Sequence, residues 1–340
     1  MVTMRRWLLT LVLLHTLDTL GADPGGNTLY TRIVDTGPGL CTITRLPGPH
    51  YLVYDTGHWN GAVLCDLAIK RIVPADASID LLILSHSDAD HLGATDDILN
   101  TYPVKRVVRT GDVRWDTTTW RNAYWAIRRQ REAGELEDIN LWTLPDKAMP
   151  PGETYTYGDT SLVFVSGFND PPSDWGISFF DQSKMNNAIS IVIRLAYAGR
   201  AILFTGDAVG RTDDGNKDCW ATEKYMVDNT PDVPLQSDVI IAPHHGANNA
   251  SSDCFIEAVD PDWVIFPAGS DHEHPRAAAV RRYLDHGIPL ERIFRTDLGD
   301  NEGDEEWSHG TSATGDSRGD DDIEIIITAD GEVTVQYAQD

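Results

Sequence analysis

The sequence predicts an α/β protein in which two mixed β-sheets stack face to face and helices cover their outer faces, giving four layers. Two observations favour this fold. Short apolar runs bounded by glycine and proline alternate with helical patterns through both halves of the chain. In addition, 340 residues with a 41% hydrophobic share suffice for one large domain with a complete core.

The first half of the chain supplies five expected strands and two expected helices. The strands are Leu29–Val34, Leu40–Arg45, Tyr51–Tyr54, Leu81–Leu84 and Val104–Val108, and the helices are Leu92–Leu99 and Thr117–Glu137. The run Leu81–Leu84 is apolar throughout, which is typical of a strand buried on both faces. Trp120, Tyr124 and Trp125 lie in the second helix, where we expect them to pack and not to bind a ligand.

The second half repeats the alternation of strands and helices. Its expected elements are the strands Ser161–Ser166, Ile189–Leu195, Ala201–Phe204, Val239–Ala242 and Trp263–Phe266, the helix Ala277–Asp285, and a closing hairpin of Ile323–Thr328 and Val333–Tyr337. The hairpin turn is Asp330-Gly331, a pair that favours tight turns.

Residues 23–340 are expected to form one domain that carries an acidic insertion at about residues 297–322. This segment has ten carboxylates, one basic residue (Arg318) and frequent glycine and serine, which predicts a solvated, mobile loop. Carboxylates also suit calcium, but the spacing from Asp300 to Asp304 is not a full EF-hand pattern, so we favour the loop.

Residues 1–22 have the features of a signal peptide. Arg5 and Arg6 precede an apolar run at Trp7–Leu14, and Leu20-Gly21-Ala22 offers a cleavage site. No later run reaches the roughly 20 apolar residues of a membrane helix. We expect export to the periplasm or the outside, with no stable membrane insertion after cleavage. The alternative is a partly buried N-terminal helix in a cytoplasmic protein.

The cysteines and the net charge restrict the chemistry. Cys41, Cys65, Cys219 and Cys254 form no Cys-x-x-Cys pair, which argues against a zinc–thiolate site and leaves disulfides or buried thiols. The formal charge of −26 repels nucleic acid unless a metal or a basic groove offsets it locally.

The segment His86-Ser87-Asp88-Ala89-Asp90-His91 carries the strongest chemical signal. Its four potential ligands, His86, Asp88, Asp90 and His91, directly follow a buried strand. Imidazole and carboxylate suit zinc, manganese or iron. A helix cap would explain one carboxylate but not two flanking histidines. The segment therefore predicts a metal site.

Two further groups of candidate ligands stand at strand ends. Asp207 follows Ala201–Phe204, and His244 and His245 follow Val239–Ala242. A carboxylate can bridge two cations that lie roughly 3.5–4 Å apart. We expect Asp207 to be this bridge. One of the two histidines is expected to be a ligand, and the other a substrate contact or a hydrogen-bonded supporting residue.

Taken in order, these motifs resemble the metallo-β-lactamase superfamily, and within it the soluble hydrolase-like domain of ComEC-type DNA-uptake proteins. The resemblance runs from about Tyr30 to Tyr337, apart from the acidic insertion, and implies the superfamily's αββα sandwich. Its other markers are Asp35-Thr36-Gly37-Pro38-Gly39, Asp55-Thr56-Gly57, Asn186-Asn187-Ala188-Ile189-Ser190, Thr205-Gly206-Asp207, Pro243-His244-His245-Gly246, His274-Pro275 and Arg295-Thr296-Asp297.

The resemblance implies one or two divalent ions, with zinc expected and manganese as the alternative. One site would consist of Asp90, His91, Asp207 and His245, the histidine that the family pattern favours as ligand. The other would consist of His86, Asp88 and the shared Asp207. Many superfamily members add a histidine to this second set. Here the corresponding region has Asn186 and Asn187, as in the ComEC-like branch, so the second site is one ligand short. The alternatives are that this site binds its ion weakly, completes its ligands with water or substrate, or stays empty.

Three residues are assigned to catalysis, and one to support. Asp90 and His244 are expected to act at the metal. By resemblance, His274 lines the site and stabilises charge or protonates a leaving group. Asp55 is expected to support the metal loop through hydrogen bonds.

The favoured function is a hydrolase that uses a metal-bound hydroxide on phosphodiesters, in the manner of a nuclease. It rests on the resemblance, because the ComEC-like branch is associated with DNA uptake and presumed strand degradation. One alternative is an exported hydrolase of small esters, lactams or phospholipid-type substrates. The other is a non-catalytic metal-binding scaffold. The expected partner is a small-molecule or phosphodiester substrate, and the net charge disfavours nucleic acid.

Overall fold

The computed structural model describes residues 26–178, 181–212, 215–269, 272–300, 303, 305–307 and 319–339. The expected signal peptide, residues 1–22, lies outside these ranges. Among the described residues, no helix combines the length and the apolar character that a membrane crossing requires.

The first sheet has eight strands in the order β15-β14-β1-β2-β3-β4-β5-β6. The bounds are β1 Leu29–Ile33, β2 Cys41–Leu46, β3 His50–Thr56, β4 Leu81–Leu84, β5 Arg106–Arg109, β6 Glu137–Asn140, β14 Ile323–Ile327 and β15 Val333–Tyr337. Strands β3 to β6 run parallel to one another, whereas β1 pairs antiparallel with both β2 and β14. The sheet is therefore mixed, as predicted.

The second sheet has seven strands in the order β13-β12-β11-β10-β9-β8-β7. The bounds are β7 Thr154–Tyr157, β8 Thr160–Ser166, β9 Val192–Tyr197, β10 Arg200–Phe204, β11 Val239–Ile241, β12 Trp263–Phe266 and β13 Ile293–Arg295. Strands β10 to β13 are parallel to their neighbours, and β7 to β10 form an antiparallel series.

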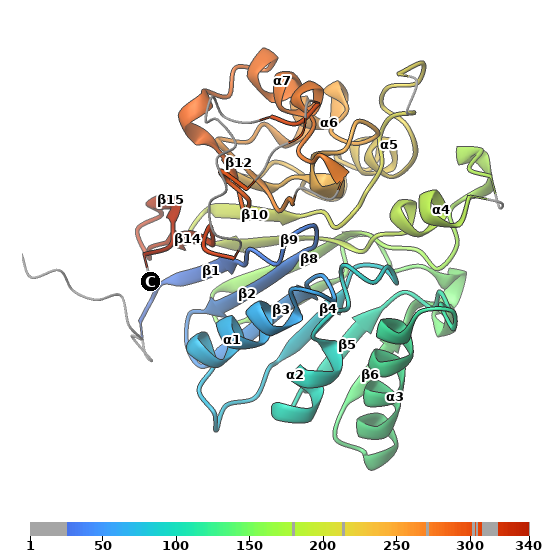
Figure 1. Ribbon diagram of the computed structural model, residues 1–340, viewed down its shortest axis with the longest axis vertical. Coiled ribbons are helices and arrows are strands. Elements are labelled where there is room, and N and C mark those ends of the chain that lie inside the picture. The colour runs from blue at the N-terminus through green and yellow to red at the C-terminus, as the bar shows by residue number, and fades with distance from the viewer. Residues whose placement is uncertain are drawn as a thin grey trace, which may run out of the picture.

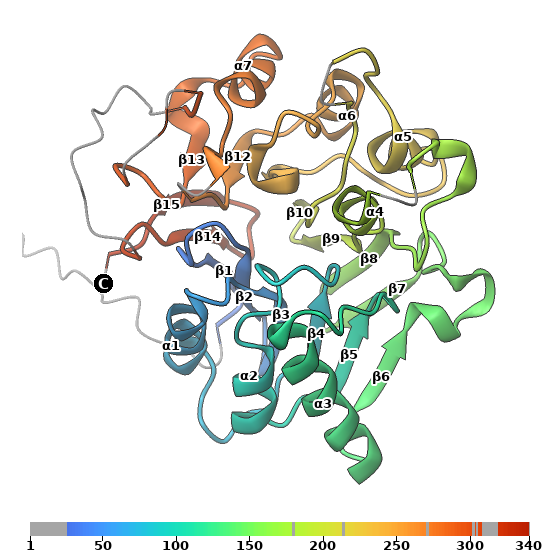
Figure 2. The ribbon, with the colours of Figure 1, turned by 45° about the vertical axis from the view of Figure 1, so that its right-hand side comes forward.

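Helices cover the outer face of each sheet (Figures 1 and 2). The first sheet carries α1 Ala62–Ile72, α2 Thr95–Thr101 and α3 Thr118–Ala133, and the second carries α5 Ala221–Asp228, α6 Asp253–Val259 and α7 Ala277–Asp285. Further helical segments are α4 Gln182–Ala188 and the 3₁₀ turns η1 Leu141–Thr143, η2 Pro145–Lys147, η3 Ser173–Trp175, η4 Pro243–Gly246 and η6 Leu290–Arg292. The predicted four-layer αββα sandwich is confirmed.

Three apolar layers hold the sandwich together, and one strand can contribute alternate side chains to two of these layers. In β4, Leu81 and Ile83 face the core between the sheets, whereas Leu82 packs beneath the helices. In β10, Ile202 and Phe204 face the same inner core, and Leu203 faces the outer one. Because successive side chains of a strand point to opposite faces, a strand covered on both sides must be apolar throughout.

Several predicted boundaries were wrong, each for a local reason. The helix expected over Thr117–Glu137 ends at Ala133, because Gly134 adopts φ 76° and turns the chain into β6. The helix expected from Leu92 begins at Thr95. The strand expected from Ile189 begins at Val192, because the preceding residues close α4 and place its asparagines beside the metal loop.

Several carboxylates of the acidic segment are buried, contrary to the solvated loop that we expected, whereas Glu305 and Asp320 are exposed as expected. Asp297 and Glu306 both pair with the buried guanidinium of Arg295, and Asp322 accepts a 2.5 Å hydrogen bond from Arg32 Nε. These carboxylates lie in the fold because a cation from the sheet neutralises each of them.

All four cysteines form disulfides. Cys41 in β2 is bonded to Cys65 in α1, and Cys219 is bonded to Cys254 in α6. Of the two alternatives that the sequence left open, the structure selects disulfides over free thiols. Each bond ties a helix to a neighbouring segment of its own half of the sandwich.

Candidate metal centre

The candidate ligands converge where parallel strands of both sheets end. Asp55 lies at the end of β3, the cluster that begins at His86 follows β4, Asp207 follows β10, and His245 lies in η4 after β11. Functional side chains gather at the carboxyl ends of parallel strands because neighbouring strands end at the same edge. The two sheets therefore bring together residues that are more than 150 positions apart, such as His91 and His245.

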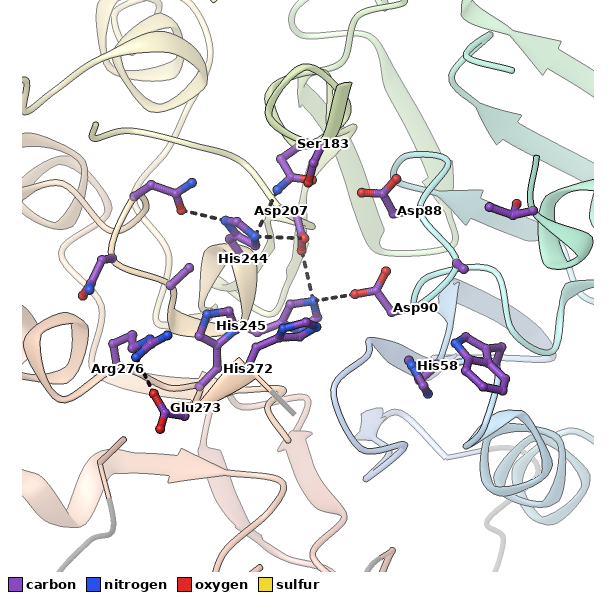
Figure 3. Close-up of a pocket in the computed structure, with 18 of the residues that line it drawn as sticks. His58, Asp88, Asp90, Ser183, Asp207, His244, His245, His272, Glu273 and Arg276 are labelled. Carbon is purple, nitrogen blue, oxygen red and sulfur yellow. Dashed lines mark hydrogen bonds and ion pairs between the residues drawn. The ribbon is translucent and has the colours of Figure 1, made fainter. Parts of the chain in front are cut away.

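Four of the six predicted ligands form one compact group: Asp90, His91, Asp207 and His245. Asp207 Oδ1 lies 3.1 Å from His91 Nε2 and 3.3 Å from His245 Nε2. The two Nε2 atoms are 3.2 Å apart, and Asp90 Oδ2 lies 3.6 Å from His245 Nε2. Figure 3 shows both carboxylates directed at His245.

These distances fit a single tetrahedral ion. Metal–ligand bonds of about 2.0–2.1 Å place tetrahedral ligand atoms roughly 3.3 Å apart. Moreover, Asp207 Oδ1 is buried and has no hydrogen-bond partner. A buried carboxylate oxygen without a partner is costly, and a cation at this point would satisfy it.

The tautomers of the two histidines also fit. His91 Nδ1 donates to Asp55 Oδ2 at 2.7 Å, and His245 Nδ1 donates to the carbonyl oxygen of Pro267 at 2.6 Å. Each Nε2 therefore presents its lone pair to the other across 3.2 Å, an arrangement that only a proton or a cation between them can stabilise. Asp55 in turn accepts from the backbone N–H of Ser85 at 2.7 Å, which bears out its expected supporting role.

Opposite charges in the group stabilise one another. Burial alone would lower the pKa of His91, but Asp207, Asp55 and Asp90 raise it well above the usual value. Burial opposes the ionised form of Asp207, yet His91, His245 and His244 together hold its pKa well below the ordinary range. The carboxylates thus create a strong negative potential at the point where the imidazole nitrogens meet.

A strained turn directs the histidines inward. His244 and His245 both adopt positive φ, 50° and 54°, and Gly246 follows at 81°. A Cβ at Gly246 would lie 2.6 Å from both Phe266 and Pro275, so only glycine fits there. Positive φ in consecutive non-glycine residues is uncommon and often marks a functional site.

His244 does not join the four-residue group. Its Nδ1 donates to Asn249 Oδ1 at 2.7 Å, and its Nε2 accepts from Asn187 Nδ2 at 3.0 Å while lying 3.7 Å from Asp207 Oδ2. This places His244 beside the centre, and His245 within it, as the family pattern favoured.

His86 and Asp88 also lie outside the four-residue group. His86 Nε2 is buried without a hydrogen-bond partner, 3.7 Å from Asp88 Oδ2 and 3.8 Å from Asp207 Oδ2. Asp88 Oδ1 instead accepts from Arg114 Nη1 at 2.5 Å and from Asn186 Nδ2 at 2.7 Å. Figure 3 shows Asp88 well separated from His244.

The centre lies in a cavity of about 1050 Å³. His274 lines this cavity, with its ring centroid 5.9 Å from that of His244 and 6.3 Å from that of His245. Burial and the neighbouring histidines lower the pKa of His274 to about 2, so its imidazole is neutral.

The sequence interpretation did not identify several residues of the cavity. The walls also contain His58, Trp59, Arg114, Asn249 and Arg276. Arg114 lies in the loop after β5, the parallel neighbour of β4. Its position at this strand end was the one available signal, because no motif surrounds it.

Comparison with known proteins agrees with this geometry. Residues 34–269 match the family model of the metallo-beta-lactamase superfamily. The chain is 30% identical over 274 residues to competence protein ComA of Neisseria gonorrhoeae, covering 80% of this chain and 31% of that protein. It is 24% identical over 222 residues to ComE operon protein 3 of Bacillus subtilis, covering 64% of this chain and 24% of that protein. The chain thus spans about a quarter to a third of these curated relatives.

Solved structures give more distant similarities. A CmlA beta-hydroxylase mutant aligns with a TM-score of 0.44 at 16% identity, covering 80% of this chain and 53% of that one. Zinc-bound PqqB from Methylobacterium extorquens aligns with a TM-score of 0.39 at 9% identity, covering 75% and 77%. With its sandwich fold, its candidate metal centre and a family match over most of its length, this chain belongs to the metallo-beta-lactamase superfamily.

Proposed function

We propose that the protein is a metal-dependent hydrolase of phosphodiesters. The observation that carries this proposal is the convergence of Asp90, His91, Asp207 and His245 on one point in an open cavity. Arg114 lines the cavity, and the N–H groups of its guanidinium that Asp88 does not use can contact an anionic substrate, whereas Arg276 is paired with Glu273 and Glu305. The curated relatives, named as competence and recombination proteins, also favour a phosphodiester.

When bound, a divalent ion would lower the pKa of a water molecule and neutralise charge on the reacting group. Zinc suits the two imidazoles and two carboxylates, and manganese is the alternative.

The residues of the cavity have separate tasks in this reaction. A bond forms between the water oxygen and phosphorus, the bond to the leaving alcohol breaks, and the proton lost by water must be balanced by one delivered to the alcohol. The side chain of Asp90 is partly open to the cavity, where it can accept a hydrogen bond from the attacking water. His244 lines the cavity beside Asp207, and its Nε2 can take the proton in exchange for the hydrogen bond from Asn187. Because burial lowers the pKa of His244, it would pass this proton readily to the leaving alcohol.

His274 contributes from the cavity wall. As a neutral imidazole it can donate a hydrogen bond to a phosphoryl oxygen as negative charge develops. Because His274 and His244 lie on the same wall, they can contact adjacent oxygens of one substrate.

Two observations bear on where the enzyme works and on what substrate. Both disulfides support export to an oxidising compartment. The net charge of −26 favours small diesters or short strands over long nucleic acids. The natural partner that we propose is therefore a small-molecule or short phosphodiester substrate.

The test is hydrolysis of bis(p-nitrophenyl) phosphate by the full chain reconstituted with zinc or manganese. Wild type should be active, and Asp207→Ala should lose roughly 100-fold or more of the activity together with its metal. Asp228→Ala, which removes an exposed carboxylate on α5, is the matched control. Activity on esters or lactams alone would favour the alternative substrate class, and metal binding without hydrolysis would favour a scaffold role.

A further inference from the structure

The carboxylate of Asp88 forms an ion pair with an arginine. Its Oδ1 accepts from Arg114 Nη1 at 2.5 Å and from Asn186 Nδ2 at 2.7 Å. The resemblance implied that Asp88 would hold a second ion together with His86 and Asp207. In the structure, one of the Asp88 oxygens is instead bound to a permanent cation and an amide.

The rest of the second ligand set is less compact than the first. His86 Nε2 lies 3.7 Å and 3.8 Å from the nearest oxygens of Asp88 and Asp207. In the first site Asp90 Oδ2 is similarly distant from the imidazoles, at 3.6 Å and 3.9 Å, but Asp207 Oδ1 lies only 3.1–3.3 Å from both of them. Within the described part of the chain, these three residues do not form a compact ligand group. In the described ranges no further histidine completes these three residues, and the neighbouring Asn187 donates to His244.

The positive charge of Arg114 also disfavours a second metal ion. The side chains of Arg114 and Asp88 are only 22% and 20% exposed, so solvent screens their charges incompletely. A divalent ion at Asp88 would share that carboxylate with the guanidinium and would be repelled by it. Asp207, the other carboxylate of the set, directs Oδ1 at the first site and leaves only Oδ2, 3.8 Å from His86 Nε2, for a second ion.

We infer that this chain holds a single metal ion and that Arg114 takes the place of the second ion as a fixed positive charge. Arg114 lines the same cavity as Asp207 and His245, where a guanidinium can bind an anionic phosphate or carboxylate oxygen. This inference goes beyond the proposed function, because it concerns metal content and can be tested without any substrate.

The experiment is titration of the metal-free full chain with Mn²⁺, followed by calorimetry and electron paramagnetic resonance. Wild type should bind one ion per chain and give the spectrum of isolated Mn²⁺. Arg114→Met keeps the aliphatic stem but removes the charge, so it should bind a second, weaker ion and show a spin-coupled pair. Arg114→Lys should still bind one ion, and so should Arg128→Met, the same substitution at an exposed arginine of α3.

Thermal unfolding of each variant establishes that it is folded before the ions are counted. Two coupled ions in wild type would overturn this inference and leave the proposed function standing. One ion in both wild type and Arg114→Met would show that Arg114 is not what excludes the second ion, and would also overturn it. No ion in wild type would overturn the inference and the proposed function together.

Discussion

Asp55 shows how one residue that lies outside the ligand group determines whether a ligand can bind. Its Oδ1 accepts from the Ser85 backbone N–H, and its Oδ2 accepts from His91 Nδ1, each at 2.7 Å. The first bond fixes the carboxylate, and the second fixes the His91 tautomer that leaves Nε2 free for a metal.

We therefore predict that Asp55→Asn weakens metal binding about 10- to 100-fold. The asparagine oxygen must face Ser85 N–H, which directs the amide NH₂ at His91 Nδ1 and moves the proton of His91 to Nε2. Competition with a chromophoric chelator measures the affinity. Asp66→Asn, at a carboxylate of α1 that pairs with Lys70 and does not line the cavity, is the control. Equal affinity in wild type and Asp55→Asn would contradict the positioning role.

Between elements, Glu223 of α5 connects that helix to the start of α6. Its carboxylate accepts from the backbone N–H groups of Ser251 at 2.6 Å and Ser252 at 2.7 Å, and from the Ser252 hydroxyl. Burial outweighs these hydrogen bonds and raises the pKa of Glu223 to about 7. Asn249, which accepts a hydrogen bond from His244 and orients it, lies in the same loop as Ser251 and Ser252.

This raised pKa predicts a pH dependence of the unfolding free energy. Folding favours the protonated Glu223, so its contribution is full below about pH 4.5 and is lost as pH rises through about 7. The loss amounts to roughly 3 kcal/mol between pH 5 and 8. Glu223→Gln should lack this component. The unfolding free energy of both proteins is measured with urea in the presence of chelator at each pH, and the difference between them removes the effect of the other titrating groups. Parallel plots of unfolding free energy against pH would refute the prediction.

For the whole molecule, the net charge of −26 opposes any long polyanion that approaches the cavity. A bound metal and Arg114 offset this field only locally. Repulsion between like charges weakens as salt shortens the Debye length, from about 30 Å at 0.01 M to about 10 Å at 0.1 M.

If single-stranded DNA is hydrolysed, its kcat/KM should rise several-fold between low and moderate salt, because screening removes the repulsion. The value for bis(p-nitrophenyl) phosphate, measured in the same buffers, should change little and corrects for salt effects on the metal centre. A fall in the DNA rate with salt is what a basic binding groove would produce, and it would contradict this prediction.

The sequence by itself determined the layers and most of the centre. Runs such as Leu81–Leu84 are apolar on both faces, and this local property identifies a strand covered on two sides. Asp90, His91, Asp207 and His245 were predicted because each lies in the loop that follows such a strand. Helix ends and short elements such as β6 and α4 were not, because single turns decide them.

Only the tertiary structure decided which residues meet. The pairing of Arg114 with Asp88, the exclusion of His244 from the ligand group and the burial of Asp297 all depend on contacts between segments far apart in the chain. The local sequence identifies the residues that can ionise or bind a metal. The packing of the two sheets determines which oppositely charged group each of these residues faces.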